Sequence, residues 1–195
     1  MWAPRPRKGC SSVFDFPWPE PEFVIRPAKK ADLPALGRLG LALAQAHHAW
    51  DPARFFVPEG GARGYADWLG REARSRRAVV LVARTEGRVA GYAYGRLEPR
   101  DWNLLRDRCG VVVDLMVDPY YRRLGAGSRL LKALIAALQA KGAPFVVLQA
   151  ASANKSAQRL FESAGFRPTL VEMAKTLEPA PEPKKRRAAR TRKGA

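Results

Sequence analysis

Residues 114–131 read DLMVDPYYRRLGAGSRLL, and this stretch decides the fold that the sequence predicts. Its first residues complete the run VVVDLMV (111–117), which is nearly all apolar and therefore typical of a strand covered on both faces. Pro119 ends the run, and leucines at helical spacing begin after Gly125 and Gly127. A buried strand, a proline turn and a glycine-rich helix start thus follow one another directly.

The junction between this strand and this helix has the features of an anion site. Gly125 and Gly127 let a ligand approach the backbone, and the free amides and dipole of a helix's first turn favour phosphate. Arg122 and Arg123 are placed to add charge-assisted hydrogen bonds. The glycine spacing is not that of a P-loop, and a dinucleotide fingerprint needs a third glycine. Glycines that merely tighten the turn are the alternative, but the neighbouring strand, proline and arginines favour a pyrophosphate site.

The flanking sequence predicts the other elements of a mixed α and β domain. The strand at 111–117, the helix at 125–140 and the strand at 145–148 should form a right-handed βαβ unit with parallel strands. A helix capped by Asp32, with Pro34 in its first turn, should follow a first short strand. We further expect helices at 65–74 and 154–164, a hairpin of strands at 79–84 and 89–96, and strands at 23–26, 166–169 and 170–177.

The length of 195 residues suits one domain with a real core. The formal charge is +17, and seven of its positive charges lie within residues 184–195, which contain no acidic residue. We expect an extended N-terminal arm over 1–22, a folded domain over 23–177 and a basic, disordered tail over 178–195.

Composition excludes several classes of protein. Two cysteines and two adjacent histidines give neither a disulfide framework nor metal-ligand spacing, so no metal is expected. No apolar run reaches 18 residues, and prolines and charges interrupt the N-terminus where a signal peptide is apolar, so we expect a soluble, cytoplasmic protein without a membrane. The tail at 184–195 could hold nucleic acid weakly through phosphate neutralisation, but without interleaved aromatic residues a solvated terminus is favoured.

Three separate blocks together resemble the GNAT superfamily of acyl-CoA N-acyltransferases, over most of residues 23–177. They are IRPA (25–28) followed by Asp32 and Leu33, the stretch 114–127, and NKSAQRLFESAGF (154–166). The resemblance implies an α+β fold of three layers. Its central, twisted, mostly antiparallel sheet should splay between the strands at 111–117 and 145–149, with helices on both faces.

The resemblance also implies transfer of an acetyl group from acetyl-CoA directly to a primary amine of a small molecule or a protein. Acetyl-CoA would lie in the splayed gap, with its pantetheine along an unpaired strand edge and its pyrophosphate on the amides of the following turn. The cofactor-binding residues so implied are Leu115, Met116, Val117, Arg122, Arg123, Leu124, Gly125, Ala126, Gly127, Ser128 and Asn154.

The sequence departs from the family's common acid and base. Many members have Tyr seven residues after the Asn, where this chain has Phe161, and a subset has Glu five residues before it, where this chain has Gln149. Neither replacement exchanges a proton. Asp114 is the first candidate for a base, because a carboxylate in an apolar strand is costly unless it is paired or used. Glu98 is the second, although a solvated strand end suits it better.

Several alternatives stay open at this point. Asp114 could instead only bond a neighbouring backbone group or an arginine, and His47 and His48, near the expected acceptor pocket, could be helix-end surface residues. The missing Tyr and Glu also fit a CoA-binding regulatory protein without turnover. The acceptor, the acyl chain length and the oligomeric state, a homodimer included, are not readable from the sequence.

Overall fold

A two-residue turn organises the longest hairpin of the structure. Strand β2 (Ala78–Thr85) and strand β3 (Arg88–Glu98) pair antiparallel across Glu86 and Gly87, whose φ angles are 50° and 74°. Positive φ at both positions gives the turn the twist that matches the flanking strands. The predicted hairpin is confirmed.

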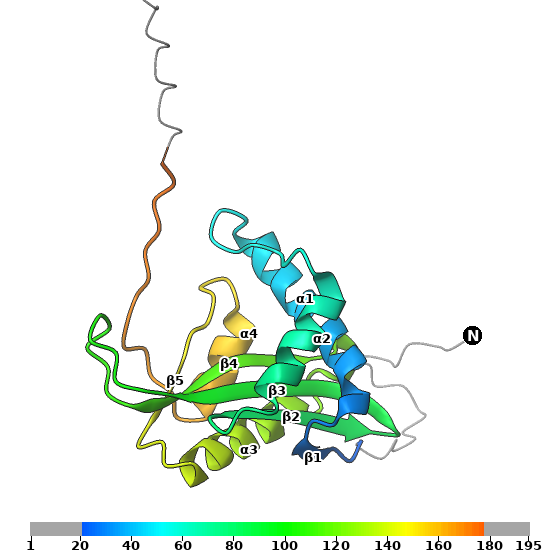
Figure 1. Cartoon of the computed structure of the whole chain (residues 1–195). Helices are drawn as coiled ribbons and strands as arrows, with labels where there is room; N and C mark the ends of the chain where they lie inside the picture. Colours follow the sequence, from blue (N-terminus) through cyan, green and yellow to red (C-terminus); the bar gives the residue numbers. More distant parts are fainter. Residues whose placement is uncertain (1–20, 178–195) are drawn as a thin grey trace, which may run out of the picture.

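The computed structural model describes residues 21–177, and its central element is a five-stranded sheet (Figure 1). The strand order is β1-β2-β3-β4-β5, with β1 at Val24–Pro27, β4 at Cys109–Val117 and β5 at Val146–Leu148. All neighbours are antiparallel except β4 and β5, which are parallel. The mostly antiparallel sheet and its one parallel βαβ unit agree with the prediction. The expected arm and tail, including residues 184–195, fall largely outside the described residues.

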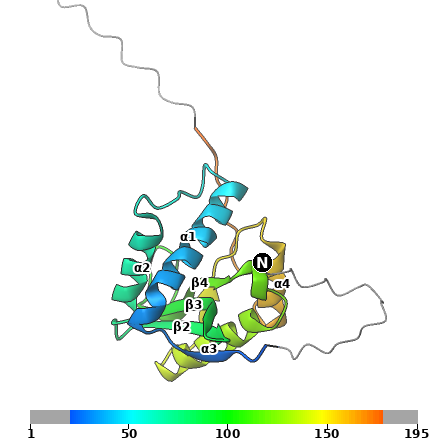
Figure 2. The same ribbon diagram turned by 90° about the vertical axis from the view of Figure 1, so that its right-hand side faces the viewer.

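Helices cover both faces of this sheet (Figure 2). Helices α1 (Leu33–Trp50) and α2 (Gly61–Glu72) pack on one face, around a core that includes Tyr92 and Met116. Helices α3 (Ala126–Ala140) and α4 (Lys155–Ser163) pack on the other, around Leu130, Leu134 and Phe161. Two 3-10 turns, η1 (Lys30–Asp32) and η2 (Pro119–Tyr121), precede α1 and α3. The two helical layers and the sheet form the three-layer fold that was expected.

The last two predicted strands, at 166–169 and 170–177, are wrong. After α4 the chain turns at Gly165, whose φ is 88°, and residues 167–177 run on without helix or strand. Their apolar pattern suits a strand, but a strand forms only where a neighbour supplies backbone hydrogen bonds, and none lies beside this segment within the described residues.

Asp32 has a different role from the predicted helix cap. Its carboxylate makes no capping bond to α1. It instead accepts hydrogen bonds from Arg26 at 2.7 and 3.1 Å, from Arg84 at 2.7 Å and from the Lys29 amide at 2.8 Å. Asp32 is only 1% exposed. Burial alone would raise the pKa of its carboxyl group, but these donors lower it to about 2. The buried carboxylate therefore ties β1, β2 and the start of α1 together.

We predict that Asp32→Asn destabilises the protein by about 3 kcal/mol at pH 7, because it leaves two partly buried arginines without their carboxylate. The folded pKa lies below the unfolded value, so the ionised group stabilises the fold above about pH 4 and this contribution is lost as the pH falls towards 2. Urea unfolding at pH 7 and at pH 3 should show the difference between variant and wild type shrinking at the lower pH.

Asp107→Asn is the matched control, because Asp107 also pairs with an arginine, Arg100, but on the surface. Exposed pairs contribute little, so this variant should unfold almost as the wild type does. Equal destabilisation by the two substitutions would contradict the role given to Asp32.

Candidate functional site

The sheet opens between β4 and β5. The two strands pair only over Gly110, Val111 and Val112, opposite residues 146–148, and β4 then continues for five more residues to Val117. Along those five residues, no described strand lies on the β5 side of β4. The splay expected between these strands is therefore present, and it leaves the edge of β4 at Leu115, Met116 and Val117 beside the gap.

The turn after β4 presents a run of unpaired backbone amides. Asp118 accepts a hydrogen bond from the Tyr120 amide and starts η2. Arg123 and Gly125 then take left-handed conformations, with φ of 62° and 86°, before α3 begins at Ala126. Within residues 21–177, the amides from Arg123 to Ser128 donate to no other backbone group. A concave run of such amides at the start of a long helix is suited to an anion.

Gly127 leaves the gap open between β4 and α4. A Cβ atom at this position would lie 3.4 Å from Leu160 and 3.6 Å from Val117, which are ordinary contacts. Internal packing therefore does not require glycine here. Gly125 differs, because its φ of 86° is costly for other residues. The absent side chain of Gly127 leaves space between Leu160 of α4 and Val117 of β4.

The other residues that were expected to bind the ligand differ in how they lie. Asn154 caps α4 by accepting a hydrogen bond from the Ala157 amide at 3.1 Å, which leaves its side-chain NH₂ to donate elsewhere. Arg122 folds back on the strand, donating from Nε to the Val117 carbonyl at 3.1 Å, so it does not point over the helix start. Arg123 and Leu124 lie in the turn before α3, and Ala126 and Ser128 lie in its first turn.

A bulge in the β3–β4 pairing turns Asp114 towards α1 and α2. Tyr94 pairs with Asp114 while the next residue, Gly95, pairs with Val112, so Val113 is the extra residue. In a regular strand, side chains alternate between the two faces of the sheet, so residues 112 and 114 would lie on the same face. Because of the bulge, Val112 packs in the α3 core while Asp114 faces the opposite helical layer.

Two tyrosines hold one oxygen of Asp114 and leave the other open. Tyr65 of α2 and Tyr92 of β3 each donate to Oδ2 at 2.8 Å. Oδ1 makes no hydrogen bond within the described residues. It is not fully buried, so it remains in contact with solvent. Asp114 as a whole is 8% exposed. The carboxylate is therefore fixed in place by Oδ2, and its other oxygen has no partner within residues 21–177 and keeps some contact with solvent.

Burial raises the pKa of Asp114 above its ordinary value, although both tyrosine hydrogen bonds and the nearby His47 act against this rise. Burial and the Asp114 carboxylate also raise the pKa of Tyr65, which therefore stays protonated and keeps donating. A raised carboxyl pKa brings the proton affinity of Asp114 closer to what a general base needs at neutral pH.

Aromatic residues line the α1 side of this carboxylate. His47 donates from Nδ1 to the Leu43 carbonyl at 2.9 Å, and its ring lies edge-on to the rings of Trp50 and Phe55, with ring centroids 5.1 and 5.0 Å apart. His48 instead contacts the Phe55 carbonyl at 2.7 Å. Of the two histidines, only His47 influences the pKa of Asp114.

Glu98 is not brought together with Asp114. It lies opposite Cys109, at the far end of β4 from the glycine turn, and it pairs with Arg96 and Arg106. Phe161 is buried in the core against Phe166, and Gln149 is exposed after β5. Positions 98, 149 and 161 therefore place no general acid or base beside the gap.

Sequence reasoning missed Tyr65 as a site residue. The signal lies in Gly40 of α1, because a Cβ atom there would lie 2.1 Å from the Tyr65 ring. Only glycine lets α2 approach closely enough to set the Tyr65 hydroxyl on Asp114. The hydrogen bond from Tyr65 to Asp114 joins residues 49 positions apart, so no local sequence pattern predicts it.

Within residues 21–177, no group of three or more His, Cys, Asp or Glu side chains could hold a metal ion. In the same range, no helix combines the length and apolar character that crossing a membrane requires.

Comparison with known proteins gives matches to acetyltransferases. The sequence model of the Acetyltransferase (GNAT) family matches residues 42–166. The uncharacterized N-acetyltransferase YhfO of Bacillus subtilis is 28% identical over 142 residues, which are 73% of this chain and 88% of that protein. The family match over residues 42–166 thus spans the gap, the glycine turn and Asp114.

Solved structures share the fold. A variant of the BH1408 protein from Bacillus halodurans superposes with a TM-score of 0.69 at 22% identity, over 80% of this chain and 99% of that one. The aminoglycoside N-acetyltransferase AAC(6')-Iy, solved in complex with CoA, superposes with a TM-score of 0.61 at 16% identity, over 80% and 95% of the two chains.

We predict that Tyr65→Phe raises the pKa of Asp114 further, because it removes a hydrogen bond that favours the ionised carboxylate. The variant should also lose about 1 kcal/mol of stability at pH 7. A carboxyl-carbon NMR titration and urea unfolding measure the two effects. Tyr94→Phe removes a comparable bond, to Glu72. That control should leave the Asp114 pKa unchanged, and a similar rise in both variants would contradict the assignment.

Proposed function

Because the chain belongs to the acetyltransferase (GNAT) family, we propose that it moves an acetyl group from acetyl-CoA directly to a primary amine at the gap beside β4. The chain is an N-acetyltransferase by its family and relatives. The donor, the site residues and the chemistry at Asp114 are the proposal. The observation that carries it is the opened sheet, whose strand edge leads directly to the unpaired amides of Arg123 to Ser128.

The fit of acetyl-CoA to this gap rests on two features of the chain. The edge of β4 at Leu115 to Val117 is suited to pair with an extended, amide-bearing pantetheine arm, as an exposed strand edge pairs with a peptide; at the Val117 carbonyl the arm would share or replace the hydrogen bond from Arg122. The pyrophosphate would bind on the amides at the start of α3, where Gly127 leaves room for it. Asn154 offers its side-chain NH₂ to the arm from the other wall of the gap.

In the proposed reaction, Asp114 receives the proton of the acceptor. An amine that arrives as ammonium, with a pKa near 10, must lose a proton before it attacks the thioester. Oδ1 of Asp114 is the open oxygen, and the bonds from Tyr65 and Tyr92 keep the carboxyl group oriented. The first proton passes to Oδ1 directly or through one water molecule, and the amine then attacks the thioester carbon. As the C–S bond breaks, the second nitrogen proton passes to the leaving sulfur or to water.

The leaving thiolate receives no proton from the position of Phe161. A thiol pKa near 8.5 makes CoA a tolerable leaving group without such an acid. The negative charge that develops on the thioester oxygen requires hydrogen-bond donors, and the β4 edge supplies backbone amides there. The chain therefore contributes orientation, a base and amide donors.

The acceptor pocket is formed from the α1 and α2 side. His47, Tyr65 and the aromatic rings around them border Asp114. We propose that a primary amine enters from this side, as either a small molecule or a protein amine. A positively charged amine is attracted by the Asp114 carboxylate.

We predict that Gly127→Glu lowers the affinity for CoA at least tenfold, because it places bulk and negative charge against the pyrophosphate. Isothermal titration calorimetry with CoA measures the effect. Gly127→Ala is the control, since a methyl group fits between Leu160 and Val117 and adds no charge. Unchanged affinity in the Glu variant would place the phosphate site elsewhere.

We predict that Asp114→Asn lowers kcat/KM by about 10² to 10⁴ at pH 7, because the amide still accepts from both tyrosines but takes up no proton. Thiol release from acetyl-CoA, with a panel of amines, measures the rate. In the wild type, kcat/KM should rise with pH through a pKa above the ordinary Asp value, and this step should vanish in the variant.

Glu98→Gln is the control for this experiment, because Glu98 lies in an arginine cluster away from the gap. It should retain nearly full activity. A large loss with Glu98→Gln and little loss with Asp114→Asn would reverse the assignment of the base.

A further inference from the structure

The loop between β3 and β4 presents apolar side chains to solvent. We name residues 99–108 the β3–β4 loop. Trp102, Leu104 and Leu105 at its tip are 75%, 54% and 87% exposed. Figure 1 shows this loop projecting beyond the end of the sheet. Three large apolar side chains at a projecting tip are costly in water unless the tip meets an apolar surface.

Hydrogen bonds within the loop fix its tip. Asp101 and Arg106 exchange both backbone hydrogen bonds, at 2.8 and 2.9 Å, and so close a turn between them. The Asp101 carboxylate accepts from the amides of Asn103 and Leu104, at 2.9 and 3.1 Å. Arg106 pairs in turn with Glu98 at the end of β3. The tip is therefore a turn of defined conformation that holds its apolar side chains outward.

Leu105 takes a backbone conformation that favours glycine. Its φ of 48° lies in the left-handed region, which is unfavourable for a bulky side chain. Glycine at this position would remove the strain, and a polar residue would remove the exposed apolar surface. The chain accepts both costs at one residue. A strained residue on a well-formed turn points to a function for its side chain.

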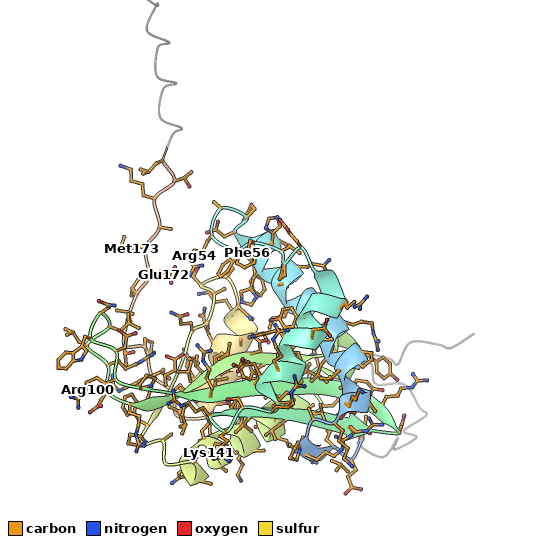
Figure 3. The ribbon with its side chains drawn as sticks, in the orientation of Figure 1. Arg54, Phe56, Arg100, Lys141, Glu172 and Met173 are labelled. Carbon is orange, nitrogen blue, oxygen red and sulfur yellow. The ribbon has the colours of Figure 1, made fainter. Side chains whose placement is uncertain are left out.

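Two other segments lie beside the base of this loop. Arg108 donates to the Gly142 carbonyl, directly after α3, at 2.9 Å. Lys141 in turn donates to the Arg76 carbonyl at 2.8 Å. The end of α3 and the chain between α2 and β2 therefore meet the β3–β4 loop at one end of the sheet. Figure 3 shows Arg100 in the loop and Lys141 at the end of α3.

Positive charge at this end of the sheet exceeds negative charge. Residues 74–77 include three exposed arginines whose side chains make no ion pair within the described chain. The nearby acids already have partners. Glu98 pairs with two arginines, Asp107 pairs with an arginine of the loop, and Glu72 accepts a hydrogen bond from a buried tyrosine. Uncompensated cations therefore lie behind the apolar tip.

We propose that the β3–β4 loop binds the protein to the surface of a membrane that contains anionic lipid. Trp102, Leu104 and Leu105 enter the interface between headgroups and acyl chains, where tryptophan is favoured. Lys141 and the arginines of residues 74–77 lie at the level of the lipid phosphates. An apolar tip in front of a group of cations matches the order of acyl chains and anionic headgroups in a bilayer.

The chemistry of this surface favours a bilayer over other occupants. Nucleic acid also binds cations, but it offers no apolar surface to Leu104 and Leu105, which cannot stack on bases as aromatic rings do. A protein partner requires a pocket shaped to the projecting tip, whereas a fluid bilayer accepts the tip without one. Cations and leucines on one surface are therefore both explained by anionic lipid.

Binding of this kind needs no membrane-spanning segment. The sequence favoured a protein without a membrane because it has no long apolar run, and a tip of three apolar side chains creates none. The loop joins β4 at the end where Glu98 pairs with Cys109, opposite the glycine turn. A membrane at the loop therefore leaves the proposed CoA gap open, and binding does not depend on the proposed reaction.

The first test is binding of the full chain to lipid vesicles. Sedimentation with vesicles of equal parts phosphatidylglycerol and phosphatidylcholine should retain the protein, whereas phosphatidylcholine alone should bind it about tenfold more weakly. Raising the salt concentration from about 0.1 to 0.5 M should weaken binding, because screening increases. Absence of binding to the phosphatidylglycerol vesicles would overturn the proposal.

The second test removes the apolar tip. The triple variant Trp102→Ser, Leu104→Ser and Leu105→Ser should lower the vesicle partition coefficient about tenfold or more, because only the cations remain. Leu105→Ser alone and Phe56→Ser form a matched pair, since these side chains are 87% and 80% exposed. Figure 3 shows Phe56 well apart from Arg100 of the loop. Only Leu105→Ser should weaken binding, and equal effects of the pair would overturn the proposal.

The third test separates a local surface from the total charge. The test variant changes the three arginines beside the loop: Arg74→Gln, Arg76→Gln and Arg77→Gln. The control removes the same charge from exposed positions on three helices: Arg38→Gln, Arg63→Gln and Lys132→Gln. The test variant should bind phosphatidylglycerol vesicles about tenfold more weakly, and the control less than about threefold. Equal losses would show that net charge alone attracts the chain and would overturn the proposal.

A fourth measurement identifies what the tip enters. Vesicles with brominated acyl chains should quench the fluorescence of the wild type more than that of Trp102→Phe, which keeps an apolar ring at the tip. Equal quenching would overturn the proposal. So would binding of a DNA duplex, or a loop-dependent dimer in light scattering, by a chain that does not bind vesicles. All substituted side chains are exposed, so each variant should fold normally, which circular dichroism checks.

Discussion

The short pairing of β4 with β5 is the constraint on which the rest of the structure depends. Three residue pairs join these parallel strands, and the longer strand then continues alone. Had the pairing continued, the β4 backbone would be saturated and no arm of a ligand could lie along it. Because it stops, the strand edge and the start of α3 form one continuous surface of hydrogen-bond donors and acceptors. The candidate site is thus a consequence of where a sheet stops being paired.

A second local irregularity directs the chemistry. The bulge at Val113 moves Asp114 from the face of Val112 to the face of α1 and α2. Without it, the carboxylate would lie in the apolar core beside α3, away from Tyr65 and Tyr92. Gly40 completes the arrangement by letting Tyr65 approach from α2. One extra residue in a strand and one missing side chain in a helix therefore hold the Asp114 carboxylate in one orientation and leave one of its oxygens without a partner in the described chain.

The sequence predicted those features whose causes are local. The hairpin turn at Glu86 and Gly87, the βαβ order and the glycine turn before α3 each depend on residues close together in the chain. Asp114 was singled out because a carboxylate in an apolar strand is conspicuous. Its partner Tyr65 and the arginines around Asp32 could not be foreseen, because contacts of 49 and 52 positions depend on how whole elements pack. The strands expected after α4 failed for the related reason that a strand needs a neighbour.

The free edge of β5 and the ligand gap have a common origin. A longer β5 would offer a better edge to a further strand, but its extra residues would pair with β4 and close the gap. The protein therefore cannot cover this edge by extending the strand that forms it.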